Sequence, residues 1–202
     1  MSRLQFVRCK KSFPDQLVIH YRLRKPIARM HSESMAQLSG GSFLDSEGKL
    51  FNLGEGEPSN NSLPDLTVET PEGLPIAAHF LQLWNPEISL ELKDNPFPKI
   101  KKISVDSWEE ITFFIGSGSD EKQISKIVWG NFIPKDFQEK LKRFQQVGLD
   151  LKAKSLMVQY INLRDALHRQ VLPTGDRERV GQVFVRPLSS DPLQIKFETG
   201  KK

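Results

Sequence analysis

Apolar and polar residues alternate in several short segments of the chain, and a period of two predicts strands with one buried face. The clearest alternations involve Leu17, Ile19, Tyr21 and Leu23, then Ile111, Phe113 and Ile115. Further short strands are predicted at 4–8, 27–30, 42–45, 49–51, 88–92, 100–106, 124–129, 155–164 and 182–186. This gives about ten strands, with a frayed tail from Ser189 onward in which Leu193, Ile195 and Phe197 could pair weakly. Gly48, in the tight turn between 42–45 and 49–51, is expected in the left-handed conformation.

Two other segments show the 3.6-residue period of an amphipathic helix. The first begins near Pro75 and ends at Asn85-Pro86, and the second runs from Pro134 to Val147, where Gly148 is expected to cap it. Strands and helices do not alternate in a βαβ rhythm, which favours antiparallel pairing. The predicted fold class is α+β: a mostly antiparallel sheet with about two helices packed on one face.

Composition restricts the function classes only modestly. The 202 residues include 29 Lys and Arg against 25 Asp and Glu, for a net charge of +4, and 38% are hydrophobic. No apolar run is long enough to span a bilayer, and the first residues lack the apolar stretch of a signal peptide, so the chain as given is expected to be soluble. The single cysteine, Cys9, excludes a disulfide framework and a cysteine-based zinc site.

The search for catalytic or metal-binding motifs is negative. The four histidines form no close pair with metal-ligand spacing, so neither a metal nor a cofactor is expected. Gly116–Asp120 has the composition of a phosphate loop without the lysine and serine spacing, and is read as a turn. One alternative stays open: a β-rich hydrolase with a dispersed carboxylate site that includes Asp106 and Glu110.

Basic residues cluster near residues 22–29 and 99–102, which raises nucleic-acid binding as a third reading. Single-strand binders interleave aromatic side chains with the cations on one face. The sequence does not display that interleaving, so solvated strand faces are the expected explanation.

Several motifs, in this order, resemble the FtsQ/DivIB family of bacterial cell-division proteins. FPDQLVI (13–19) and RKPIA (24–28) resemble the end of that family's POTRA domain and its junction with the following β domain. FLDSEGKLF (43–51) resembles the next hairpin, LPDL (63–66) the element after it, and YINLR (160–164) a terminal strand. The likeness covers about residues 4–165.

The resemblance implies three regions: a partial POTRA-like segment at 1–30, a β domain at 31–188 and a flexible tail at 189–202. Met1 falls inside what would be the POTRA domain, which implies a fragment, a misplaced start or a lost membrane anchor. Pro26, Ile27 and Ala28 would form the domain junction. The plainer reading of Pro26 is that it ends a strand.

Family members are not enzymes. The resemblance implies a scaffold on the outer face of the bacterial cell membrane at the division site, holding small coiled-coil partners of the FtsB and FtsL type and regulating septal peptidoglycan synthesis. FtsB adds a strand to the terminal edge of the family's sheet. Here that edge would be residues 156–166, or 182–186 if the later strand is outermost. The implied partner-binding residues are Tyr160, Leu163, Arg164, Asp165, Val183, Phe184, Val185 and Arg186.

Overall fold

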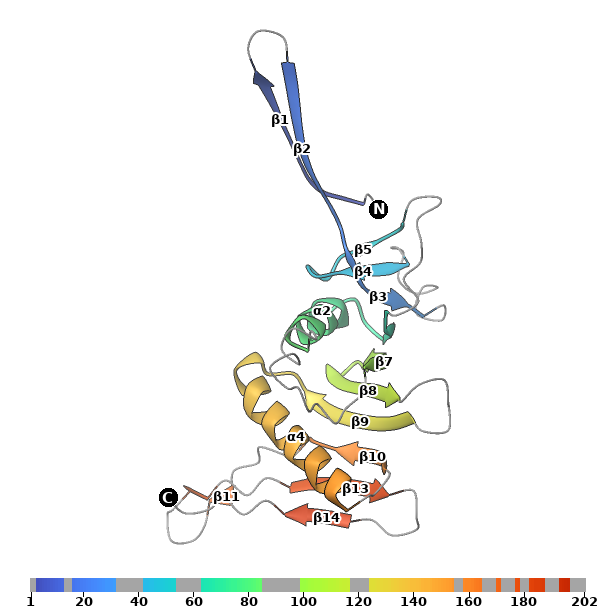
Figure 1. Cartoon of the computed structure of the whole chain (residues 1–202), viewed down its shortest axis with the longest axis vertical. Helices are drawn as coiled ribbons and strands as arrows, with labels where there is room; N and C mark the ends of the chain where they lie inside the picture. The colour runs from blue at the N-terminus through green and yellow to red at the C-terminus, as the bar shows by residue number, and fades with distance from the viewer. Residues whose placement is uncertain are drawn as a thin grey trace.

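Among the described residues, the computed structural model has one large sheet, two α-helices against it and two small two-stranded sheets, one of which is a hairpin that projects from one end (Figure 1). It describes residues 3–12, 16–31, 42–53, 63–84, 99–116, 124–154, 158–164, 170–171, 177–178, 182–187 and 193–196. The α+β prediction, with antiparallel pairing dominant, is confirmed. The alternation expected at residues 88–92 lies outside the described residues.

The helices are α2 (Gly73–Leu83) and α4 (Phe137–Ala153), and a 3-10 turn, η2 (Pro134–Asp136), leads into α4. The strands before α2 are β1 (Leu4–Ser12), β2 (Gln16–Leu23), β3 (Pro26–Met30), β4 (Phe43–Asp45), β5 (Leu50–Phe51) and β6 (Asp65–Val68). Between the helices lie β7 (Ile100–Val105), β8 (Glu110–Gly116) and β9 (Ile124–Asn131). The later strands are β10 (Val158–Asn162), β11 (Gln170–Val171), β12 (Arg177–Glu178), β13 (Gln182–Pro187) and β14 (Leu193–Lys196).

The large sheet has the order β14-β13-β10-β9-β8-β7-β6-β3-β4-β5. Six of its nine neighbouring pairs are antiparallel, whereas β3–β6, β6–β7 and β9–β10 are parallel. The expectation that the chain contains no βαβ unit is therefore wrong. β6-α2-β7 and β9-α4-β10 are both βαβ units, because each helix connects two parallel neighbours.

Both helices lie on one face of the sheet, as the sequence predicted. The β6-α2-β7 and β9-α4-β10 crossovers begin at strands that run in the same direction, and each moves one strand toward the β14 edge. Two right-handed crossovers with this arrangement place their helices on the same face of the sheet. Ring contacts confirm it: Phe80 of α2 lies 5.6 Å from Phe113 of β8, and Phe137 of α4 lies 5.4 Å from Trp129 of β9, measured between ring centroids. These rings form the centre of the core.

Helix α4 continues past Gly148 to Ala153, so the predicted cap at that glycine is wrong. The reason is packing. Val147 and Leu151 lie one turn apart and are both buried in the core. Their burial outweighs the ~1 kcal/mol that a glycine costs inside a helix.

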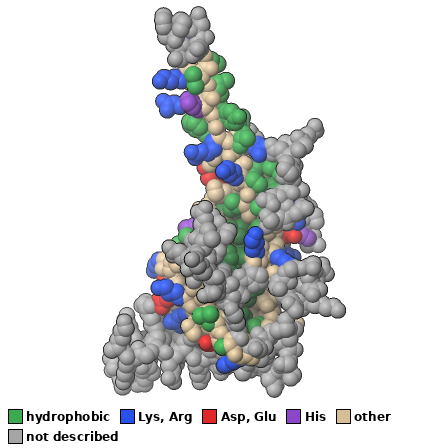
Figure 2. Space-filling model, viewed as in Figure 1, with side chains coloured by type: hydrophobic (Ala, Val, Ile, Leu, Met, Phe, Trp, Pro, Cys, Tyr) green, Lys and Arg blue, Asp and Glu red, His purple; other side chains and the backbone are tan. Residues whose placement is uncertain are grey.

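The β1–β2 hairpin forms a sheet of its own and projects away from the body (Figure 1). Its register pairs Val7 with Tyr21 and Cys9 with Ile19 on one face, and Arg8 with His20 on the other. Figure 2 accordingly shows apolar side chains along one side of the hairpin and basic side chains along the opposite side. Tyr21 is 65% exposed, so the apolar face is open to solvent among the described residues.

Two boundaries differ from the sequence-based expectation. The sequence-based boundary put β3 in the N-terminal segment, residues 1–30. In the structure β3 belongs to the large sheet, so the hairpin joins the sheet at residues 24–25. Residues 193–196, placed in a flexible tail, form β14 and pair with β13. Main-chain pairing explains the second difference, because the backbone groups along β13 can pair with even a short segment.

Candidate partner-binding surface

The strands expected to bind a partner lie at the C-terminal end of the sheet but not at its edge. β10 is paired with β9 on one side and β13 on the other, and β13 is paired with β10 and β14. Both strands expected to present an open edge are therefore interior, and that expectation is wrong. Among the described residues, the free edge at this end belongs to β14.

The alternation of side chains along β10 and β13 divides the predicted partner-binding residues into two groups. Leu163, Val183 and Val185 are fully buried in the core and face the helices, so they cannot offer side chains to a partner. Tyr160 is half-buried and lies directly opposite the exposed Arg186, on the face away from the helices. Phe184 pairs through its backbone with Asn162 and Gln194, and Asp165 lies outside the described residues.

Arg164 lies two residues beyond the end of β10, where several contacts fix its position. Its backbone N–H donates to Oδ1 of Asn162 at 3.0 Å, and its guanidinium forms an ion pair with Glu110 of β8. Gly130 has φ +80°, and a Cβ there would lie 2.9 Å from Cγ of Arg164. The absence of a side chain at this glycine lets the arginine lie across β9 and reach Glu110.

A cavity of about 330 Å³ opens beside this ion pair, between the ends of β8, β9 and β10 and the start of α4. It is lined by Glu110, Trp129, Asn131, Ile133, Asp136, Phe137, Lys140 and Arg164. Lys140 is buried; its ammonium donates to the carbonyl of Trp129 and lies 5.2 Å from the centroid of that ring. The cavity wall therefore carries two cationic side chains, Lys140 and Arg164, and two carboxylates, Glu110 and Asp136, so its formal charges cancel.

The carboxylates of the hydrolase alternative have structural partners. Asp106 accepts hydrogen bonds from the backbone N–H groups of Trp108 and Glu110, each at 2.9 Å, which stabilises the turn between β7 and β8. Glu109 in that turn has φ +61°. Glu110 is paired with Arg164. A capping role in a tight turn accounts for Asp106 without a catalytic one.

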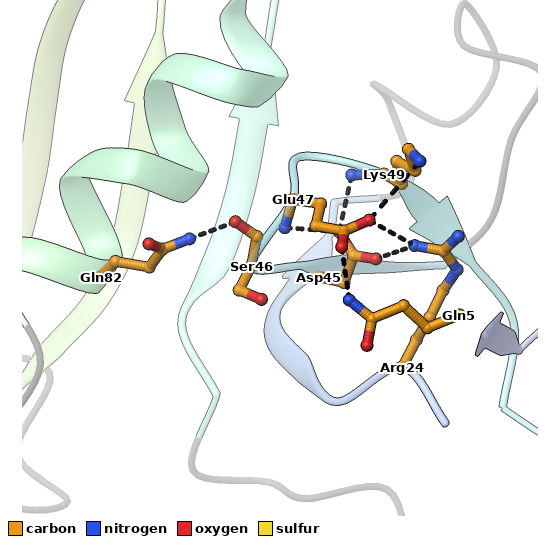
Figure 3. Close-up of polar contacts among 7 residues, drawn as sticks. All are labelled: Gln5, Arg24, Asp45, Ser46, Glu47, Lys49 and Gln82. Carbon is orange, nitrogen blue, oxygen red and sulfur yellow. Dashed lines mark hydrogen bonds and ion pairs between the residues drawn. The ribbon is translucent and has the colours of Figure 1, made fainter. Parts of the chain in front are cut away.

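The junction between hairpin and sheet is a polar cluster, drawn in Figure 3. Asp45 is buried; its Oδ1 accepts from the N–H groups of Glu47 and Lys49, at 2.9 and 2.8 Å, and its Oδ2 pairs with Arg24. Gln5 of β1 donates to Glu47. This hydrogen bond, helped by the charges of Lys49 and Arg24, holds the pKa of Glu47 below its ordinary value.

The same cluster extends to α2. Gln82 donates to the carbonyl of Ser46, and Gly48, with φ +78°, lies so close to Pro75 that a Cβ there would be 2.9 Å from its Cα. The predicted hairpin with a left-handed Gly48 is therefore confirmed. Of the predicted junction residues, Ala28 is fully buried within β3, while Pro26 and Ile27 are half-buried.

Within the part of the chain that the structure describes, no group of three or more His, Cys, Asp or Glu side chains could hold a metal ion. No helix among those residues combines the length and apolar character needed to cross a membrane. Comparison with known protein families finds no family model that matches the chain, and comparison with curated proteins finds no match. The function is therefore argued from the residues and their geometry.

Proposed function

We propose that the chain is a non-enzymatic scaffold that binds a small partner by accepting a strand at the C-terminal end of its sheet. The sequence resemblance to the FtsQ/DivIB family suggests the partners, which would be coiled-coil division proteins of the FtsB and FtsL type. It also suggests the place, the extracytoplasmic face of the cell membrane at the division site. In this role the chain would help to regulate septal peptidoglycan synthesis.

The observation that carries the proposal is the strand order β10-β13-β14. The three strands stand consecutively at one end of the sheet, and β14 has a described neighbour on one side only. An edge strand presents a row of unpaired N–H and C=O groups, which is what strand addition requires. The partner strand would therefore pair with β14, one strand further along the sheet than the sequence suggested.

Arg164 and Arg186 would contribute side-chain contacts to the bound partner. Arg186 is exposed on β13, and half of the Arg164 side chain is exposed at the end of β10. Arginine is frequent among the residues that dominate binding energy at interfaces. Leu163, Val183 and Val185 support the edge from the core and do not contact the partner in this proposal.

The experiment measures binding of the organism's own FtsB-type and FtsL-type proteins, co-expressed and purified with the tagged chain. Deletion of residues 189–202 removes β14 and should abolish binding. Single prolines at Gln194 and Ile195 refine the test, because neighbouring residues of a strand direct their N–H groups to opposite sides. One proline removes an N–H group that is directed at β13, and the other removes an N–H group that is directed toward the partner strand. Both substitutions should weaken binding.

The proposal requires both a complex and its dependence on β14. Failure of the intact chain to capture either division protein would contradict it. Equal or tighter capture by the chain lacking 189–202 would also contradict it, because β14 would then cover the binding edge rather than provide it. Circular dichroism of the deletion variant verifies that the remaining sheet is folded.

A further inference from the structure

A row of alternating basic and aromatic residues crosses the open face of the sheet, and only the strand register reveals it. Lys102 of β7 lies opposite Phe114 of β8, which lies opposite Lys126 of β9. Lys126 lies opposite Tyr160 of β10, and Tyr160 lies opposite Arg186 of β13. Five adjacent strands thus contribute basic, aromatic, basic, aromatic and basic side chains in a single line.

The row faces away from the helices. The residues beside it on the same strands, among them Ile103, Phe113 and Ile161, are fully buried against α2 and α4. Because side chains alternate along a strand, the row must point to the opposite face. The three cations of the row are exposed, and the two rings are half-buried.

The charges of the row favour an anionic ligand. None of its three cations forms a salt bridge with a described residue. The register continues through Asp65 of β6, but that carboxylate is already paired with Arg29 of β3 at 2.7 Å. The carboxylate in register with the row, Asp65, is therefore already paired with a cation of its own. Asp106 and Glu110 have the same parity at the far ends of β7 and β8: Asp106 accepts from the backbone N–H groups of Trp108 and Glu110, and Glu110 is paired with Arg164.

The spacing of the cations and rings along the row limits which anionic polymers could match it. Neighbouring strands lie about 4.8 Å apart, so residues on every second strand are roughly 10 Å apart. The cations recur at this interval, and so do the two rings. Successive phosphates of a nucleic-acid strand lie closer together than this, whereas one disaccharide repeat of an extended glycan has a similar length. The row therefore matches a chain with one anionic group in each disaccharide.

We propose that this face binds an anionic polysaccharide, laid across β7, β8, β9, β10 and β13. Sugar rings pack on Phe114 and Tyr160, because the C–H groups of a pyranose carry partial positive charge and the face of an aromatic ring is negative. Carboxylates of the glycan pair with Lys102, Lys126 and Arg186. The site uses the sheet face and not the β14 edge, and Arg186 is the residue that it shares with the surface proposed for strand addition.

The test uses the full chain and a hyaluronan decasaccharide, which carries one carboxylate in each disaccharide, with calorimetry at low and at physiological salt. Lys126→Gln and Arg186→Gln should each weaken binding by about 2- to 5-fold, the range for exposed ion pairs. They should also reduce the dependence of affinity on salt. Lys142→Gln is the matched control. It removes the same charge from an exposed position on α4, on the helical side, and should leave affinity unchanged.

Three results would overturn the proposal. The first is the absence of hyaluronan binding to the intact chain at low salt. The second is an equal loss of affinity in Lys142→Gln and Lys126→Gln, which would indicate attraction to overall charge. The third is tighter binding of a thymidine decanucleotide than of hyaluronan, which would favour single-stranded nucleic acid. A neutral chitin oligosaccharide should bind more weakly than hyaluronan if the cations contribute.

Discussion

Replacement of Asp45 by alanine should destabilise the fold more than a surface substitution does. The variant removes the ion pair with Arg24 and the acceptor for the N–H groups of Glu47 and Lys49. A hydrogen bond to a charged group contributes about 1.5–3 kcal/mol. Water can replace part of that loss at the exposed turn, but the Arg24 side chain is only 12% exposed and would lose its buried partner. Breaking such a pair costs about 3 kcal/mol.

Urea unfolding followed by the fluorescence of Trp84 and Trp129 measures the effect, because both rings pack in the core. With a denaturant slope of about 2.5 kcal/mol/M, the midpoint should fall by roughly 1.2 M. Asp45→Asn keeps one acceptor and should cost less. A double-mutant cycle with Arg24→Met should give a coupling of about 1–3 kcal/mol. A coupling below about 0.5 kcal/mol would refute the claim that the ion pair joins hairpin and sheet.

Three further predictions concern single positions. Phe80→Ala should lower the free energy of unfolding by about 3–5 kcal/mol, since the ring is fully buried among the core aromatics; thermal unfolding measures it. Gly48→Ala should cost about 1–2 kcal/mol from its positive φ, and more from the approach to Pro75, whereas Gly48→Asn should be milder; the urea midpoint compares them. The pKa of Glu47 is lower in the folded chain than its ordinary value of 4.5. The ionised Glu47 side chain therefore stabilises the folded state at pH values above 4.5, and this stabilisation is lost as the pH falls through the lower pKa of the folded state. Unfolding midpoints of the wild type and Glu47→Gln should therefore differ near neutral pH and converge in acid.

The local pattern of the sequence was sufficient to predict most elements but not their neighbours. Alternation at Ile111, Phe113 and Ile115 identified β8, and the helical period identified α2 and α4, because each signal depends on residues close together in the chain. Strand order depends on pairing between distant segments. The two βαβ units were therefore missed, and so was the interior position of β10 and β13.

The same limit applies to the candidate sites. Tyr160 and Arg186 were selected as partner anchors, and the register places them side by side, but in line with Lys102, Phe114 and Lys126. The expectation that aromatic residues do not interleave with cations on one face was wrong, because the interleaving runs across strands rather than along them. A single strand displays only one member of the row, so no pattern within a strand could reveal it.

The projecting hairpin and the large sheet should unfold in separate transitions. Among the described residues, β1 and β2 pair only with each other, and an isolated two-stranded ribbon is marginally stable in water. Its amide protons should therefore exchange with solvent far faster than those of β8 and β9, which are enclosed by paired strands and helices. Heat should melt the hairpin before the ten-stranded sheet, and probes in the two regions should give separate transitions. A single stability value would then describe the sheet alone.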